Sequence, residues 1–213
     1  MINQAVSNQY DEFVHTLFNI TGDHSKDFAH AVLGITTEAY EFSEATDLYH
    51  AKEEGGDFLF FCVAAWQTLK RAFPALCEAV ESSSEQSALV SQELDAFLQM
   101  TAVEAQQSFR ADLTLLQDAS KRWVGYGKEP EEKLIGPILL VLGVAILKLL
   151  YVHPRSMLQM RATLIDPLEF IQSSVSANMA KLSTRYKNAK FTAEEALNRD
   201  LVAEREALET ALG

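Results

Sequence analysis

Positive charge, glycine, proline and cysteine are all scarce in this chain of 213 residues. With only 9 Gly and 5 Pro, it has too few turn-forming residues for an all-β fold, and its composition favours helix. Its 18 Lys and Arg stand against 30 Asp and Glu, a net charge of −12. That balance argues against nucleic acid or an anionic membrane as the main partner, because both attract positive charge. A small anionic substrate would therefore have to arrive with metal ions.

The two cysteines, Cys62 and Cys77, form neither a disulfide framework nor a metal-spaced pair. This favours a reducing, cytoplasmic compartment, and the N-terminus shows no basic start followed by an apolar run that would predict export. The apolar stretch Leu134–Val152 approaches the ~20 residues of a membrane span. Because Lys148 interrupts it and Pro137 lies near its start, we interpret it as a buried helix, with a membrane segment as the alternative.

Apolar spacing predicts a single all-α domain over residues 1–213. We divide this domain into three parts, 1–81, 82–153 and 154–213. The pattern predicts helices over 4–20, 26–50, a segment from 53 that contains nine consecutive apolar residues, 85–107, 108–124, 131–152, 167–186 and 192–212.

Two pairs of acidic residues stand out, Glu38-x-x-Glu41 and, after a short gap, Glu54-x-x-Asp57. Residues three apart share a helix face, so each pair can grip one cation from one side. Two antiparallel helices joined by a turn would bring the four carboxylates together. Such hard oxygen ligands favour Mg²⁺, with Mn²⁺ as a substitute. The alternative is a solvated acidic face, because the same spacing recurs elsewhere in this acidic chain.

Helical phase favours a metal site over a solvated acidic face. Glu38 and Glu41 lie about 60° and about 120° from the apolar stripe of their helix, whereas Glu44 lies opposite it and is expected to be a surface charge. Gly55 and Gly56 each cost the next helix roughly 1 kcal/mol relative to Ala. Two such residues in a core helix predict that something approaches its backbone closely.

The last third of the chain carries a basic complement to these acids. Asn178, Lys181 and Arg185 share one flank of the predicted helix over 167–186. Lys and Arg one turn apart can bind successive phosphates, and Arg can do so with two parallel hydrogen bonds. The alternative is a basic helix edge whose aliphatic stems cover the core.

At this point three segments resemble one family, the MazG-like all-α nucleoside triphosphate pyrophosphohydrolases. They are Ala29-His-Ala-Val-Leu-Gly-Ile-Thr-Thr-Glu38-Ala-Tyr-Glu41, Glu53-Glu54-Gly-Gly-Asp57 and Asn178-x-x-Lys181-Leu-x-x-Arg185-Tyr186. The stretch from Phe191 to Asp200 is similar to the tail of bacterial and phage members. The resemblance covers residues 28–66 and 175–205, and the long connection over 76–165 departs from it.

The resemblance implies Mg²⁺-dependent cleavage of a nucleoside triphosphate to a monophosphate and pyrophosphate by water attack on the α-phosphorus. It implies metal ligands at Glu38, Glu41, Glu54 and Asp57, the first three being the catalytic carboxylates; which Glu is the base stays open. It implies that the phosphates or the sugar are oriented by Asn178, Lys181, Arg185 and Tyr186. It also implies a homo-oligomer, with a dimer favoured. We expect Phe61 and Trp66 to pack in the core rather than against a nucleobase.

The middle segment also resembles the first acidic helix, since residues 38–46 and 112–120 align at an offset of 74. We interpret 85–152 as a degenerate repeat without metal ligands, in which Asp112 and Asp118 are plain surface charges. It should form a hairpin packed on the acidic one, with the helix over 131–152 and the apolar run over 58–66 covering each other. The alternative is chance similarity between two amphipathic helices.

Two other functions fit the acidic helices. A di-iron carboxylate bundle also uses Glu-rich helices with a Glu-x-x-His motif, and Glu12-Phe-Val-His15 has that form. Asp47-x-x-His50 comes close to it, but no second full motif is present. A non-enzymatic helical interaction module with a solvated acidic edge is the other alternative.

Overall fold

The computed structural model describes residues 8–153 and 166–212, apart from the side chains of 84–87. The described chain is all-α, with ten helices and no strand, as the composition predicts. In order these are α2 (Asn8–Leu17), α3 (His24–Glu44), α4 (Leu48–Ala72), α5 (Pro74–Ser82), α6 (Ser84–Leu98), α7 (Ala102–Tyr126), α8 (Glu132–Val152), α10 (Pro167–Arg185), α11 (Ala193–Leu197) and α12 (Leu201–Leu212).

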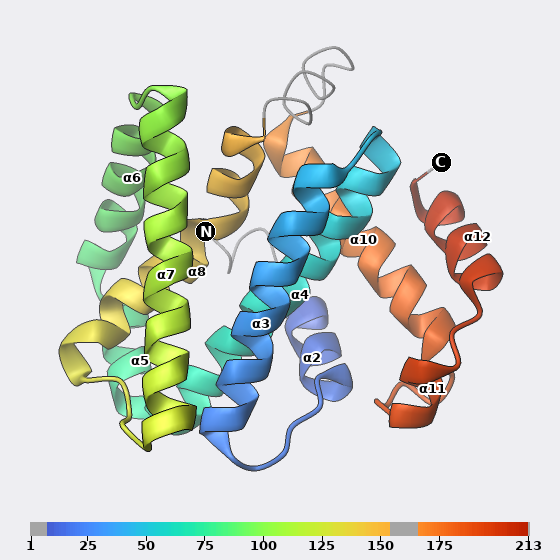
Figure 1. Cartoon of the computed structure of the whole chain (residues 1–213), viewed down its shortest axis with the longest axis horizontal. Helices are drawn as coiled ribbons and strands as arrows, with labels where there is room; N and C mark the ends of the chain where they lie inside the picture. The colour runs from blue at the N-terminus through green and yellow to red at the C-terminus, as the bar shows by residue number, and fades with distance from the viewer. Residues whose placement is uncertain (1–7, 154–165, 213) are drawn as a thin grey trace.

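The hairpin of α3 and α4 occupies the centre of the molecule (Figure 1). The prediction of one helix over 26–50 is wrong, because α3 ends at Glu44 and a new helix begins at Leu48. Asp47 is the cause: its backbone is extended and its carboxylate accepts a hydrogen bond from the His50 backbone N at 2.9 Å. Such a cap starts a helix in a new direction. The break folds the second acidic pair back toward the first.

Other helix boundaries also follow from caps. The predicted boundary between 85–107 and 108–124 is wrong, since a capping box of Thr101 and Glu104 starts one long helix, α7. Gly127, at φ 63°, ends α7 in the left-handed conformation. The predicted helix over 192–212 divides into α11 and α12, where the Asp200 carboxylate accepts a hydrogen bond from the Ala203 backbone N at 3.1 Å.

The helices form three groups around α4 (Figure 1). On one side α8 packs against α4 and α7 against α3, with α5 and α6 completing this bundle. On the other side α10 packs against α4, and α12 covers α10. The short α2 lies against α4 and α10. Most of α4 is therefore buried, as its nine consecutive apolar residues predict.

The apolar helix α8 lies inside the bundle. Among the described residues, α8 is the one helix that is both long enough and apolar enough to cross a membrane. However, 67% of its most apolar window is buried inside the molecule. It packs against α4, where a side chain at Gly143 would approach the Trp66 ring. The predicted mutual cover of the two apolar segments is therefore confirmed.

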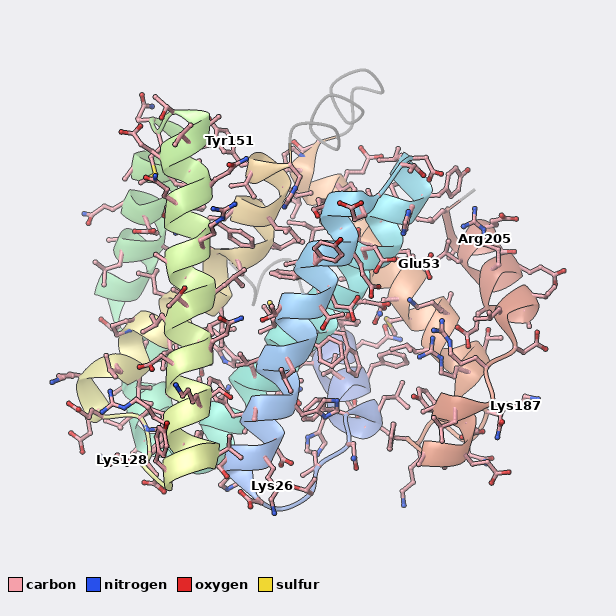
Figure 2. The ribbon with its side chains drawn as sticks, viewed as in Figure 1. Lys26, Glu53, Lys128, Tyr151, Lys187 and Arg205 are labelled. Carbon is pink, nitrogen blue, oxygen red and sulfur yellow. The ribbon has the colours of Figure 1, made fainter. Side chains whose placement is uncertain are left out.

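The predicted hairpin in the middle segment is also present. Figure 2 shows Lys128 in the turn after α7 and Tyr151 at the opposite end of α8. The equivalence at an offset of 74 does not extend to the turns, however. The turn at 45–47 would correspond to 119–121, which lie inside α7. A shared hairpin geometry thus does not follow from the short sequence match.

Asp112 is not the plain surface charge that we predicted. Its carboxylate lies 2.7 Å from the Nζ of Lys148, whose side chain is 1% exposed on α8. Glu93 from α6 contacts the same Nζ at 2.5 Å. A buried ammonium needs such partners, so α6, α7 and α8 are joined by one internal ion-pair cluster. Asp118 is exposed, as predicted.

Candidate functional site

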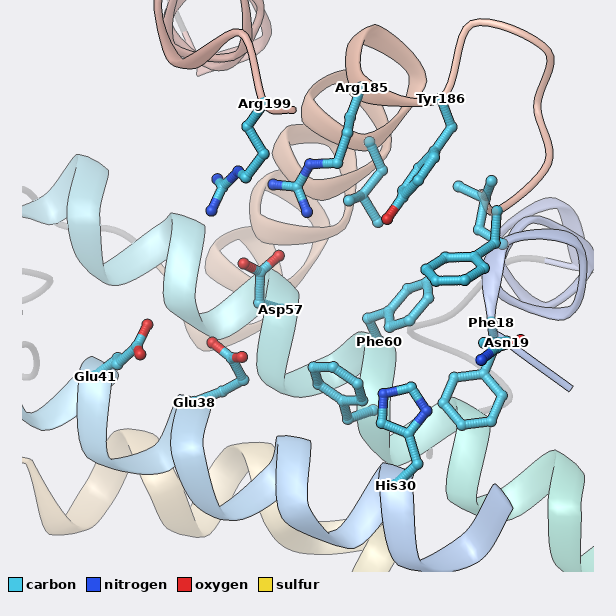
Figure 3. Close-up of a pocket in the computed structure, with 14 residues that line it drawn as sticks. Phe18, Asn19, His30, Glu38, Glu41, Asp57, Phe60, Arg185, Tyr186 and Arg199 are labelled. Atoms are coloured by element: carbon cyan, nitrogen blue, oxygen red, sulfur yellow. The ribbon is translucent and has the colours of Figure 1, made fainter. Parts of the chain in front are cut away.

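A cavity of about 330 Å³ lies between the α3–α4 hairpin and the C-terminal helices. Its charged half contains carboxylates from α3 and α4 and arginines from the C-terminal segment, and its other half is mostly aromatic (Figure 3). The lining residues are Leu17, Phe18, Asn19, His30, Glu38, Glu41, Asp57, Phe60, Phe61, Leu182, Arg185, Tyr186, Phe191 and Arg199.

Three of the four predicted metal ligands converge at the charged half. Carboxylate oxygens of Glu38, Glu41 and Glu54 lie within 4.8 Å of one another, although the residues come from two helices. Glu38 and Glu41 face the cavity because they are one turn apart on α3. Glu54 reaches them from α4 but is buried and does not itself line the cavity, whereas Asp57 does.

Burial and crowding of these carboxylates raise their affinity for protons. Burial, together with the negative charges of Asp57, Glu54 and Glu41, raises the pKa of Glu38 to about 9. Burial and Asp57 likewise raise the pKa of Glu54 to about 7, against the opposing effect of Lys181. Like charges held close together in a partly buried place repel, so a cation bound among these oxygens would relieve the repulsion.

Two side chains of α10 bind the Asp57 carboxylate. Asn178 Nδ2 donates to its Oδ1 at 2.5 Å, and the Lys181 ammonium binds its Oδ2 and also contacts Glu53 at 3.2 Å. Tyr10 OH in turn donates to Asn178 Oδ1 at 2.9 Å. Asn178 and Lys181 are buried and do not line the cavity. The structure therefore places these two predicted phosphate-binding residues where they position Asp57.

The glycine pair Gly55 and Gly56 allows α10 to pack closely against α4. A Cβ on Gly56 would meet the backbone O of Ser174 at 2.5 Å and Asn178 Cβ at 2.9 Å, and one on Gly55 would meet the Phe170 ring at 3.1 Å. The predicted close approach to the α4 backbone is therefore real, and α10 makes it. Since Asn178 lies in this contact, the glycines set how near it comes to Asp57.

Two arginines form the wall opposite the carboxylates. Arg185 from the end of α10 and Arg199 from the link between α11 and α12 both point into the charged half (Figure 3). Arg185 and Tyr186 were predicted from the sequence, and both line the cavity. Arg199 was not predicted as a site residue, although it lies in the tail segment that the resemblance includes.

The aromatic half offers a flat, apolar surface. The rings of Phe18 and His30 stack at 4.9 Å, and His30 meets Phe61 edge to face at 5.8 Å. Burial lowers the pKa of His30, which favours the neutral ring. Phe61 lies directly over Gly34, where a Cβ would fall 2.3 Å from its ring. Phe61 packs against the core, as predicted, and it also lines the cavity.

Several other predicted residues lie apart from the cavity. Trp66 donates its Nε1–H to Glu81 at 2.8 Å, on the side toward α5, and Glu44 is exposed, as predicted. His15 is exposed on α2. His50 was predicted only as a helix-end residue, but its Nε2 lies 3.1 Å from Glu54 Oε1, a contact between neighbouring turns of α4.

The chain was compared with family models, curated proteins and solved structures, and nothing matched in any of the three comparisons.

Proposed function

We propose that this protein hydrolyses a nucleoside triphosphate to the monophosphate and pyrophosphate with the help of Mg²⁺. One observation carries the proposal: a single cavity joins a converging carboxylate cluster, two arginines facing it and an aromatic half. A nucleoside triphosphate has matching parts, a polyanionic chain that binds metal and a flat base. The architecture would then be of the all-α nucleoside triphosphate pyrophosphatase type that the sequence resembles.

The donor set fits Mg²⁺. The converging donors are all carboxylate oxygens, which hard cations prefer. The raised pKa values of Glu38 and Glu54 reflect how strongly burial and neighbouring carboxylates disfavour a negative charge there that no proton or cation balances. Glu38, Glu41 and Glu54 would hold the ion, with Asp57 beside them. When bound, Mg²⁺ would neutralise phosphate oxygens and lower the pKa of a water molecule.

The chain's own residues supply orientation. Lys181 and Asn178 fix the Asp57 carboxylate, so this group would meet the substrate without reorganisation. Arg185 would bind phosphate oxygens from the opposite wall, and Tyr186 lies beside it, with its ring 5.9 Å from the guanidinium carbon. A base stacked among Phe18, His30 and Phe61 would keep the phosphates in the charged half.

The test is a panel of ribo- and deoxynucleoside triphosphates, incubated with Mg²⁺ and scored for both pyrophosphate and monophosphate. Glu41→Ala and Asp57→Ala should abolish pyrophosphate release and keep the helical fold. Glu44→Ala, which changes an exposed residue on the same helix as Glu41, should match wild type. Loss of activity in Glu44→Ala with a fully active Asp57→Ala would refute the assignment. A di-iron bundle would instead show visible absorption with iron, and an interaction module would show neither signal.

A further inference from the structure

Two arginines of the cavity share one buried carboxylate. Glu204 on α12 is 3% exposed. Arg185 donates to it from Nε at 3.0 Å and from Nη2 at 2.7 Å, and Arg199 donates from Nε at 3.2 Å and from Nη2 at 2.8 Å. We call Arg185, Arg199 and Glu204 the arginine clamp.

The clamp leaves donors free for another anion. A guanidinium has five N–H groups, and Glu204 engages two nitrogens of each arginine, so Glu204 leaves three N–H groups of each for other partners. For Arg185 one such partner is the neighbouring Tyr186 side chain, which also lines the cavity. Both arginines line the cavity opposite Asp57 (Figure 3), so donors that Glu204 does not engage can reach an anion bound there. Two positive charges against one negative charge also leave the clamp with a surplus of positive charge.

Glu204 is suited to fixing this arrangement. Burial alone would raise its pKa, but the hydrogen bonds and charges of Arg185 and Arg199 outweigh burial and lower the pKa to about 2. Glu204 therefore stays ionised at neutral pH. Bidentate pairs of arginine and carboxylate also restrict orientation, so both guanidinium planes are set before any ligand arrives.

We propose that the arginine clamp binds the phosphate farthest from the nucleoside and thereby selects triphosphates over shorter phosphate chains. This inference rests on the proposed function. In the view of Figure 3, Arg199 lies farther from the aromatic side chains than Arg185 does. A base held in the aromatic half would put inner phosphates near Arg185 and the terminal phosphate near Arg199. Glu204 acts as a positioning residue for both.

The first experiment measures binding of inorganic tripolyphosphate with Mg²⁺ by calorimetry, without a nucleotide. Arg199→Gln should weaken binding roughly tenfold or more, as expected for a lost charged hydrogen bond. Arg199→Lys keeps the positive charge but loses the planar fork of the guanidinium, so its affinity for tripolyphosphate should lie between those of wild type and Arg199→Gln. Arg205→Gln is the matched control, because Arg205, labelled in Figure 2, pairs with Glu209 on the same helix and is half exposed.

The competing explanation is that the clamp only fastens α11 and α12 to α10. It requires a lower melting temperature for Arg199→Gln with tripolyphosphate affinity equal to that of Arg205→Gln, and this result would overturn the inference. Failure of the wild-type protein to bind tripolyphosphate would overturn it as well. Clamp-dependent binding without nucleotide hydrolysis would instead remove the proposed function and leave the anion site standing.

The second experiment uses whichever nucleotide the hydrolysis panel identifies. The ratio of kcat/KM for the triphosphate over the diphosphate should fall in Arg199→Gln and in Glu204→Gln, because both lose the fixed orientation of Arg199. If Glu204 were only a competing negative charge, Glu204→Gln would tighten tripolyphosphate binding and keep the ratio. That outcome would exclude the positioning role.

Discussion

Two buried lysines in this molecule are each held by a pair of carboxylates, one in the bundle and one at the cavity. Lys148 on α8 contacts Glu93 and Asp112, and Lys181 on α10 contacts Glu53 and Asp57. Their ammonium groups are almost equally buried, with relative exposures of 1% and 2% for the residues. A buried lysine with acidic partners is therefore not by itself a sign of a functional site.

The difference lies in what surrounds each pair. Around Lys148 the neighbours are the Ser108 hydroxyl at 3.5 Å and the Phe97 ring, so the charges are confined to one compact cluster. Beside Lys181 three more carboxylates, those of Glu38, Glu41 and Glu54, converge, and the first two of them line a cavity. The comparison indicates that a surplus of crowded carboxyl groups next to open space, and not the ion pair itself, distinguishes the candidate site.

The largest effect should come from removing one surplus charge. We expect Glu38→Gln to lower nucleotide hydrolysis by about 10²- to 10³-fold, because the change removes a metal ligand and its electrostatic contribution. The measurement is kcat/KM at saturating Mg²⁺, with Glu44→Gln as the control on the same helix. Activity within a few-fold of wild type would mean that the cluster is only a crowded acidic surface.

The bundle ion pair should respond in stability instead. Lys148→Met removes the cation and leaves two partly buried carboxylates, which should cost about 3 kcal/mol in the free energy of unfolding. Denaturant unfolding measures this, and hydrolysis per folded molecule should stay at the wild-type level. Lys181→Met should lower activity as well, because Asp57 loses its partner. If both variants lose activity equally, the two clusters do not differ in the way we infer.

A smaller effect of opposite sign in the two regions sharpens the comparison. Without divalent metal at neutral pH, Glu38→Gln should raise the melting temperature by about 2–4 °C. Folded wild type holds Glu38 protonated, because burial and its acidic neighbours raise its pKa to about 9, whereas the unfolded chain ionises this group. Removing about 1 kcal/mol of that cost shifts a protein of this size by that amount. Asp112→Asn should lower the melting temperature, because it weakens the pairing of Lys148. Thermal unfolding in a chelator tests both, and Mg²⁺ should stabilise wild type more than Glu38→Gln.

The all-α fold and the acidic cluster could be predicted because both depend on local spacing. Glu38, Glu41 and Glu54 converge wherever two helices with that pattern fold into a hairpin. The position of the hairpin turn was predicted wrongly, although Asp47 is a recognisable cap, because the apolar stripe continues past it. The helix boundary there is set by the local cap and not by the apolar periodicity, as it is at Thr101.

The roles of the three polar residues on one flank of α10 could not be predicted from spacing. Asn178, Lys181 and Arg185 share a helix flank, yet the first two contact Asp57 and the third lines the cavity. Which one reaches open space depends on how closely α10 approaches the glycines of α4. Arg199 reaches the cavity because the C-terminal helix breaks and Glu204 binds both arginines, a contact that no periodicity indicates.

The smallest effect concerns the aromatic half. Gly34→Ala would place a methyl group 2.3 Å from the Phe61 ring, so the ring must move, and with it the surface that would stack on a base. Since the carboxylates and arginines stay in place, KM for the nucleotide should rise a few-fold with kcat nearly unchanged. Gly143→Ala is the matched control, because its methyl group would lie 4.0 Å from the nearest atom, on Trp66.

The Gly34→Ala variant should bind inorganic tripolyphosphate as wild type does, since that ligand has no base. A parallel loss of tripolyphosphate affinity would show instead that the charged and aromatic halves do not act separately, because movement of Phe61 would then have disturbed the whole α3–α4 interface.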